Sequence, residues 1–339
     1  MLANLPGEQI IEQLRVAVLI RRFEEELINL SSDRDIGHFH VYIGQEMTGV
    51  PALFLLEKGD LSFTTHRNHG HLLARGVPAR KMYAEILGKE TGLMGGRGGT
   101  LHLCSMEHGF PTTSSAVGGA TPLATGAAFG FKRLGLAHVS VCVFGDGALE
   151  EGSWHESINI AAMEKLPVIY LCENNSLEAL GQKAGEYPSS TLAATDLVEL
   201  VTPFGVPTIQ VDGCDSGAVH EAMSEALTRA RSGEGSTFIE ARTVRWPGNR
   251  PIWPELQTGE TNLAMAWDTS LIPDEHRIWH TEQDAVLRFV REIVAAGLIE
   301  PADILVMDKI IRADMKAAVE YALESNYPPA ELAMSLALA

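Results

Sequence analysis

Two polar motifs, each directly after a short apolar run, are the residues of this chain best suited to chemistry. Gly-Asp-Gly occupies positions 145–147 after the run 139–144, and Asn-Asn occupies 174–175 after the run 166–172. Both runs are short enough for buried strands, and the segment 150–164 between them repeats apolar residues at helical spacing. The pattern predicts a strand–helix–strand unit in which both strands end in small polar residues.

Asp146 and Asn175 are expected to lie side by side, because ligands of open parallel sheets bind outside the carboxyl ends of the strands. The glycine turn between the strand and the helix would let the backbone approach a phosphate closely. A carboxylate oxygen, an amide oxygen and diphosphate oxygens together suit Mg²⁺. The sequence therefore predicts a site for Mg²⁺ and a diphosphate at Gly145, Asp146, Gly147, Ala148 and Asn175.

Alternating strands and helices around this unit predict an α/β fold with a parallel sheet flanked by helices. We expect one domain over 1–339, with an N-terminal helical extension over 1–58 and a C-terminal helical extension over 275–339. The segment 66–99 is rich in glycine and histidine and ends in an expected loop, GLMGGRGGT. Other expected strands are 61–65, 208–211 and 237–244, and other expected helices are 7–31, 44–56, 121–134, 193–203, 216–231, 282–296 and 301–325.

Composition and charge restrict the class of protein. With 339 residues, 45% of them hydrophobic, the chain is long enough to bury a real core. A formal net charge of −18 argues against nucleic acid or an anionic membrane as a general partner. The N-terminus lacks a signal-peptide pattern, no apolar run approaches the roughly 20 residues of a spanning helix, and the cysteines form no CxxC. We therefore expect a cytoplasmic protein without disulfides.

Motifs along nearly the whole chain resemble those of the α subunit of the thiamine-diphosphate-dependent first component of 2-oxoacid dehydrogenases. Pyruvate, branched-chain 2-oxoacid and acetoin dehydrogenases have such subunits. The resemblance implies a thiamine diphosphate-binding fold and a Mg²⁺-dependent enzyme subunit that acts on a 2-oxoacid or an acyloin. The matching pieces are LIRRFEEEL (19–27), YIGQE (42–46), HRNHGHLLARG (66–76), GKETGLMGGRGGTLHL (88–103), VGGATPLATGAA (117–128), the stretch from GDG to NN, VDG (211–213) and ESNYP (324–328).

The resemblance assigns metal and phosphate contacts. Asp146 and Asn175 would bind the metal through side-chain oxygens, and the backbone carbonyl of Leu177 would be a third ligand. Arg67 would hold the diphosphate, since a guanidinium fork suits bidentate phosphate contact. The family usually has tyrosine at the position of His66, and histidine can still donate to phosphate. The alternatives are a helix cap for Asp146 and a solvated surface arginine for Arg67.

The resemblance also implies catalytic and ring-binding residues. His69 would face the reacting end of the cofactor, and His71, which follows it, is the second catalytic candidate; a capping or hydrogen-bonded core histidine is the alternative for each. Backbone groups of Ser115 and Val117 would hold the aminopyrimidine, with a plain turn as the alternative. The glycines over 95–99 are interpreted mainly as shaping the backbone.

A second chain is also implied. In two-subunit members of this family, the glutamate that activates the cofactor lies in a β subunit. A single chain carrying both halves of the cofactor site would be much longer than this one. We therefore expect a β partner, a cofactor at the interface, and a heterotetramer of two α and two β chains.

One loop departs from the family pattern. Pro247 and Asn249 stand where the family has two histidines, the second of which helps to transfer the acyl group to a lipoyl arm. Asn249 can hydrogen-bond but cannot change charge. Cofactor binding is then intact and lipoyl acylation is in doubt, so a carboligase that uses a non-lipoyl acceptor remains open beside a dehydrogenase subunit. A non-catalytic partner is a third interpretation, and a nicotinamide-dependent dehydrogenase is disfavoured because no GxGxxG follows a first strand.

Overall fold

The computed structural model describes residues 5–176, 192–194, 196–244, 246, 256 and 258–332. Within these residues, six strands form one parallel sheet in the order β2-β1-β3-β4-β6-β5. The predicted α/β fold with a parallel sheet is therefore confirmed. The strands are β1 (Leu61–Thr65), β2 (Thr113–Ser114), β3 (Ser140–Gly145), β4 (Val168–Asn174), β5 (Thr208–Asp212) and β6 (Thr237–Arg242).

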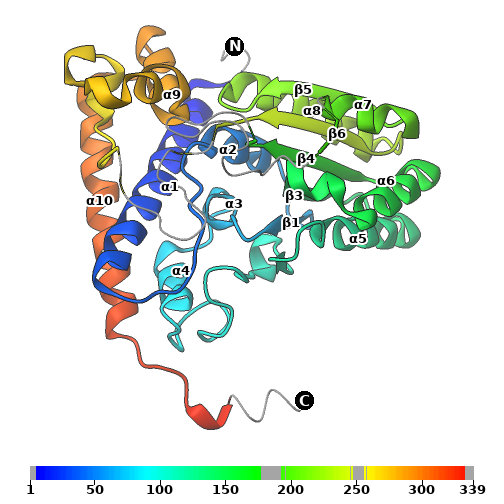
Figure 1. The fold of residues 1–339 in the computed structure, drawn as a ribbon, viewed down its shortest axis with the longest axis horizontal. Helices are drawn as coiled ribbons and strands as arrows, with labels where there is room; N and C mark the ends of the chain where they lie inside the picture. The colour runs from blue at the N-terminus through cyan, green and yellow to red at the C-terminus, as the bar shows by residue number, and fades with distance from the viewer. Residues whose placement is uncertain are drawn as a thin grey trace.

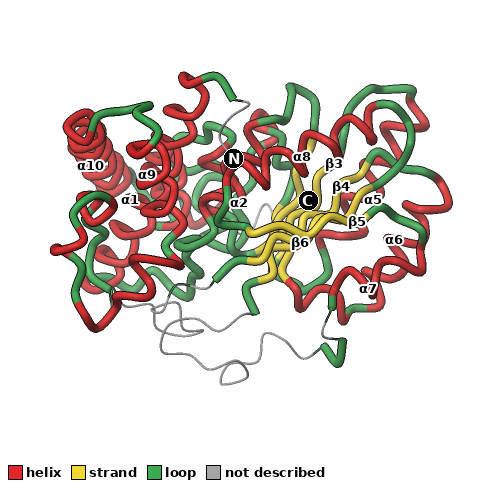
Figure 2. The backbone as a smooth tube through the Cα atoms, turned by 90° about the horizontal axis from the view of Figure 1, so that it is seen from above, coloured by secondary structure: helices red, strands yellow, loops and turns green. Residues whose placement is uncertain are grey.

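Helices cover both faces of this sheet (Figure 2). Side chains on a strand alternate between the two faces, and β3 follows this rule. Val141 and Val143 join the larger core with α1, α2, α8, α9 and α10, whereas Cys142 and Phe144 join a second core with α5, α6 and α7. The helices are α1 (Gly7–Asp33), α2 (Glu46–Phe54), α3 (His69–Ala74), α4 (Ala79–Ile86), α5 (Ala120–Leu134), α6 (Gly152–Glu164), α7 (Leu197–Val201), α8 (Ser216–Arg231), α9 (Ala285–Ala295) and α10 (Pro301–Glu324).

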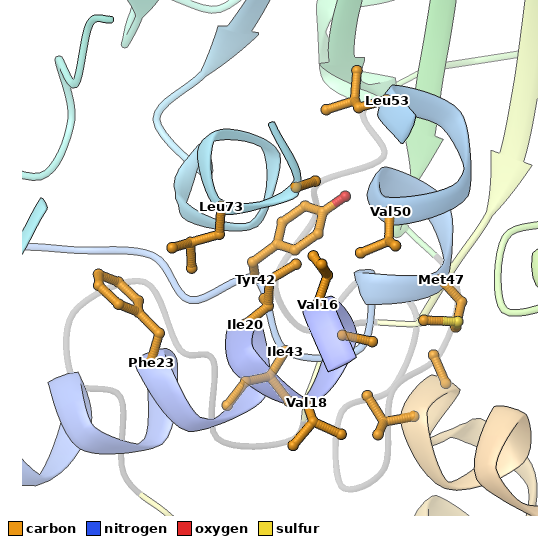
Figure 3. Close-up of a cluster of buried hydrophobic side chains, with 14 of the residues drawn as sticks. Val16, Val18, Ile20, Phe23, Tyr42, Ile43, Met47, Val50, Leu53 and Leu73 are labelled. Carbon is orange, nitrogen blue, oxygen red and sulfur yellow. The ribbon is translucent and has the colours of Figure 1, made fainter. Parts of the chain in front are cut away.

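The two ends of the chain pack against each other. Figure 1 shows α1 and α10 side by side at the end of the molecule away from α5 and α6. Figure 3 shows the Tyr42 ring between Leu73 of α3 and Val50 of α2, close to Val16 and Ile20 of α1. Tyr42 is completely buried. This core fixes the segment between α1 and α2, which leads to the site described below.

Two helices were missed by the sequence interpretation. For the segment 66–99 the sequence predicts only the loop at its end, and the structure also contains α3 and α4 there. Every residue of α3 is buried, so the helix has no polar face that would give a helical pattern. Helix α4 begins directly after Pro78, which serves as its N-cap. The predicted helix over 193–203 is shorter than expected, because Asp196 caps α7 and a 3-10 turn with Pro203 follows it.

None of the helices in the described part of the chain combines the length and the apolar character needed to cross a membrane.

Candidate active site

A cavity of about 420 Å³ lies at the carboxyl ends of four neighbouring strands. Its wall includes the last residues of β1, β2 and β3 and the residue that follows β4. This is the edge at which parallel sheets bind ligands, and the volume is within the usual range for small-molecule sites. The described lining residues are His40, Gln45, Thr65, His66, Arg67, Ser114, Ala116, Val117, Gly118, Gly145, Asp146, Gly147, Ala148, Glu150, Glu151, Glu173 and Asn175.

The structure brings Asp146 and Asn175 together in this wall, as the two motifs predict. Asp146 begins the short 3-10 turn after β3 and is 2% exposed. Asn175 donates from Nδ2 to Gln45 Oε1 at 3.2 Å, so its carboxamide oxygen is the atom that can bind a cation. A carboxylate and a carboxamide oxygen at neighbouring strand ends form a donor set that fits Mg²⁺.

The two asparagines of the second motif have different positions. Asn174 is the last residue of β4, and its Nδ2 donates to Glu240 Oε1 at 2.7 Å. Its Oδ1 accepts from the backbone N–H of Ser176 at 3.2 Å. Because successive residues of a strand point to opposite faces, only Asn175 reaches the cavity.

Carboxylates dominate the charge of the cavity wall. Asp146, Glu150, Glu151 and Glu173 line it, against a single guanidinium, Arg67, among the described lining residues. A diphosphate placed here alone would be repelled by these carboxylates. A divalent cation would reverse the local charge, so the composition of the wall fits a metal and a diphosphate together better than a diphosphate by itself.

Arg67 and two imidazoles form the side of the cavity that can meet phosphate oxygens. One guanidinium nitrogen of Arg67 donates to the carbonyl of Val41 at 2.5 Å, which fixes the side chain against the segment between α1 and α2. Burial, together with the neighbouring Arg67 guanidinium, lowers the pKa of His66 to about 4 and that of His40 to about 2. Both rings are therefore neutral near pH 7 and can each donate one N–H.

The predicted ring-binding segment 114–118 also borders the cavity. Val117 lines it and is 55% exposed, whereas the Ser115 hydroxyl lies 3.3 Å from His102 Nε2 and is not part of the lining. Gly118 has φ of +73°, and a Cβ there would come within 2.8 Å of Glu151 Cβ. Only glycine fits this position, which allows residues 114–118 and 151 to share one wall.

The two predicted catalytic histidines lie behind the cavity wall. His69 is fully buried, with Nδ1 3.0 Å from Glu24 Oε2 and Nε2 2.8 Å from Thr100 Oγ1. Both of its nitrogens are thus used inside the protein. The structure does not bring His69 to the cavity, and the geometry favours the alternative of a hydrogen-bonded core histidine.

His71 has a similar environment and one indirect link to the site. Its Nδ1 lies 2.7 Å from Thr64 Oγ1, and its Nε2 lies 3.2 Å from Glu173 Oε1. Glu173 also accepts a hydrogen bond from the Tyr42 hydroxyl. His71 can therefore orient Glu173, which lines the cavity, without touching a ligand itself.

The glycine-rich loop encloses a carboxylate of the chain itself. Glu85, at the end of α4 and fully buried, accepts from the backbone N–H groups of Met94, Gly96 and Gly98 at 2.7, 2.9 and 2.6 Å. A glycine-rich turn of this kind can bind a phosphate, but here the anion is supplied by α4. The interpretation of the glycines as backbone-shaping agrees with this arrangement.

Replacing Glu85 with glutamine should loosen this loop. The glutamine carboxamide has only one acceptor oxygen, and its NH₂ group would face a backbone N–H donor. The charge-assisted hydrogen bonds to the Glu85 carboxylate, worth about 1.5–3 kcal/mol each, are therefore weakened. We expect faster hydrogen exchange at Met94, Gly96 and Gly98, measured by mass spectrometry. Glu90→Gln, at an exposed neighbouring position, is the matched control. Unchanged protection in Glu85→Gln would contradict this role.

Several lining residues were not identified from the sequence. His40, Gln45, Glu173 and Glu151 belong to this group, together with Thr65, Ser114, Ala116 and Glu150. Gln45 lies within the YIGQE motif, and Glu173 directly precedes the Asn-Asn motif, so the neighbourhood of each motif was the available signal. Leu177, Pro247 and Asn249 lie outside the described residues.

Comparison with known proteins identifies the family. The sequence model of the family described as "Dehydrogenase E1 component" matches residues 15–250. The pyruvate dehydrogenase E1 component subunit alpha of Rhizobium meliloti is 35% identical over 328 residues, which are 96% of this chain and 89% of the relative. The acetoin:2,6-dichlorophenolindophenol oxidoreductase alpha subunits of Cupriavidus necator and Bacillus subtilis are each 33% identical, over 96% of this chain and 93% and 92% of their own lengths. The resemblance inferred from the motifs is thereby confirmed: the chain belongs to the dehydrogenase E1 component family and is an E1 α subunit of the 2-oxoacid or acetoin dehydrogenase type.

Proposed function

We propose that this chain is the α subunit of a thiamine diphosphate- and Mg²⁺-dependent enzyme that decarboxylates a 2-oxoacid or cleaves an acyloin. The observation that carries the proposal is the pairing of Asp146 and Asn175 at adjacent strand ends, in the wall of a cavity that Arg67 also lines. When bound, thiamine diphosphate supplies a nucleophilic thiazolium carbon that attacks a substrate carbonyl.

The residues of this chain bind and orient the cofactor. Asp146, Asn175 and the backbone carbonyl of Leu177 would hold Mg²⁺, and Arg67 and His66 would contact the diphosphate. Buried Gln45 supports this assignment, because its Nε2 has no hydrogen-bond partner among the described residues. A buried donor without a partner is unfavourable, and a phosphate or ligand oxygen in the cavity would satisfy it.

A β-type partner would complete the site. The chain supplies phosphate and metal contacts, and the glutamate that activates the cofactor would come from the second subunit, in an assembly of two α and two β chains. Exposed apolar side chains are consistent with a covered surface: Val117 in the cavity wall, Leu123 on α5, and Ile160 and Met163 on α6. Surfaces of this kind often mark protein–protein contacts.

Calorimetric titration tests cofactor binding. The α chain together with its β partner is titrated with thiamine diphosphate in the presence and absence of Mg²⁺. Saturable binding that requires Mg²⁺ supports the proposal. Binding that is equal without a divalent cation would contradict the metal assignment, and no binding at all would favour the non-catalytic alternative.

The acyl acceptor is a separate question, raised by Pro247 and Asn249. We propose as the second candidate that the enzyme forms carbon–carbon bonds, transferring the acyl or aldehyde unit to a non-lipoyl electrophile. We expect the α–β enzyme, given pyruvate and an aldehyde, to form an acyloin faster than it acylates a lipoyl domain. Product chromatography and mass spectrometry of the lipoyl domain measure the two rates.

The same two rates are measured for the Asn249→His variant and compared with those of the unmodified enzyme. A histidine there restores a group that titrates near pH 7, and a positioned general acid typically contributes at least 10²-fold. Lipoyl acylation should therefore rise by roughly that factor in Asn249→His, with acyloin formation little changed. Efficient lipoyl acylation by the unmodified enzyme would exclude the carboligase.

A further inference from the structure

A second cavity, which shares no described lining residue with the first, carries more basic than acidic side chains. It has a volume of about 550 Å³ and lies between the end of α1, the end of α4 and the end of α10. Three separate parts of the chain meet there. The described lining residues are Arg34, Asp35, Ile36, Ile86, Leu87, Gly88, Lys89, Leu323 and Tyr327.

Lys89 is the unusual residue of this cavity. It is only 8% exposed, yet no carboxylate or hydrogen-bond acceptor of the described residues pairs with its ammonium group. Its contact is with the Tyr327 ring, whose centroid lies 3.8 Å from Nζ. A cation–π contact is a weak attraction, whereas burial of an ammonium without a counter-ion is strongly unfavourable. The contact with Tyr327 therefore only partly offsets the burial of the charge.

The cavity has more cations than anions. Arg34 also lines it and has no ion pair among the described residues, and Asp35 is the one acidic lining residue. The Asp35 carboxylate already accepts from the backbone N–H of Gly37 at 3.0 Å. In a chain with 44 acidic and 26 basic residues, two cations left unpaired in one cavity indicate a place for an external anion.

The apolar part of the lining restricts the ligand further. Ile86 is buried, and Ile36, Leu87 and Leu323 are half-buried beside the Tyr327 ring. Sites for small molecules combine such apolar walls with a few charged groups that fix orientation. We propose that this cavity binds a small organic anion, with its carboxylate or phosphate group on Lys89 and Arg34 and its apolar body against Ile86 and Leu323.

Two hydrogen bonds link the segments that form the cavity. The backbone N–H of Glu90 donates to the carbonyl of Asn326 at 2.9 Å, and Thr91 Oγ1 donates to Ser325 Oγ at 2.7 Å. These bonds attach the segment that carries Tyr327 to the segment that carries Lys89. A bound anion would join the same two segments, so ligand binding should stabilise the folded chain.

Phenyl phosphate and benzoate are the probes, with benzyl alcohol as the uncharged comparison. The full chain with its β partner is first saturated with thiamine diphosphate and Mg²⁺, so that the other cavity does not compete for the anion. We expect at least one anion to bind saturably, with one site per α chain in calorimetry, and to raise Tm by on the order of 2 °C at ten times its Kd. The tighter of the two probes identifies the anionic group.

Charge-removing variants locate the site. Lys89→Met keeps the length of the side chain and should weaken binding by about tenfold or more, since hydrogen bonds to charged groups contribute about 1.5–3 kcal/mol. Arg34→Gln should also weaken anion binding, and because Arg34 is exposed, this substitution should not disturb the fold. Lys81→Met, at an exposed position of α4 outside the cavity, is the matched control and should bind as the unmodified chain does.

Three results would overturn the proposal. The first is no saturable binding of either anion. The second is an affinity in Lys89→Met and Arg34→Gln equal to that of the unmodified chain, and the third is a loss of affinity in Lys81→Met as large as that in Lys89→Met. None of these results bears on cofactor binding, which the calorimetric titration tests separately.

Discussion

Asp146→Ala is expected to abolish activity while the fold is retained. The carboxylate is the only charged ligand of Mg²⁺ proposed from the protein, and the same cavity wall also carries Glu150, Glu151 and Glu173. Without the cation, these carboxylates repel the diphosphate that Arg67 alone cannot neutralise. Metal stabilisation of this kind is worth several kcal/mol, so a loss of about 10³-fold or more in kcat/KM is expected.

Two measurements separate loss of the metal from loss of the fold. Circular dichroism of the Asp146→Ala variant should match that of the unmodified chain, because the residue begins a short turn after β3 and not a long helix. Calorimetry should show that Mg²⁺ no longer strengthens cofactor binding. Glu320→Ala, which removes an exposed carboxylate from α10, is the control and should keep full activity. Activity near that of the unmodified chain in Asp146→Ala would refute the metal assignment.

The central part of the fold was predictable because its patterns are local. The run before Gly145 and the run before Asn175 are apolar on both faces, as strands covered by helices on each side must be. Strand β1 and helix α8 match their predicted bounds, Leu61–Thr65 and Ser216–Arg231. Each has clear boundaries, such as Asp215, whose side chain caps α8. Short elements without such signals, α3 above all, depend on burial among distant segments.

Without the family resemblance, which supplied His66, Arg67 and Val117, the site was predictable only where a strand end carried its residue. Asp146 and Asn175 follow from the rule that parallel strands end at one edge. Gln45 and His40 come from the connection between α1 and α2, which no sequence pattern places at that edge. Their position depends on tertiary contacts such as the hydrogen bond from Asn175 to Gln45.

Dependence on tertiary contacts also explains why the positions of the histidines and the role of the glycine-rich loop could not be predicted. A sequence motif gives the residue types but does not show whether a side chain points into the cavity or into the protein core. His69 and His71 could therefore not be distinguished from cavity residues. The partner of His69 is Glu24, which lies 45 residues earlier in the chain. Likewise, the anion inside the glycine-rich loop is Glu85, on a helix that the sequence interpretation did not include.

Arg21→Met is expected to cause the largest loss of stability. Arg21 is completely buried on α1 and joins two other elements: Nε donates to Glu46 Oε1 at 2.7 Å, and Nη1 donates to Asp284 Oδ2 at 2.8 Å. Burial opposes ionisation of Asp284, yet the guanidinium and the N–H of Leu287 hold the pKa of this carboxyl below its usual value. Removing Arg21 therefore leaves buried negative charge without a counter-ion, which costs about 3–5 kcal/mol.

The consequence should extend to the cavity, because Glu46 is adjacent to Gln45 in the chain and also accepts from the backbone N–H of Gly44 at 2.8 Å. Urea denaturation measures the change in the free energy of unfolding. Arg15→Met, which breaks an exposed pair with Glu12 on the same helix, is the control and should cost less than about 1 kcal/mol. Arg21→Lys should fall between the two variants, since an ammonium keeps the charge but lacks the planar fork that meets both carboxylates. A loss in Arg21→Met no greater than that in Arg15→Met would mean that packing, and not this ion network, holds the segment before α2 against the sheet.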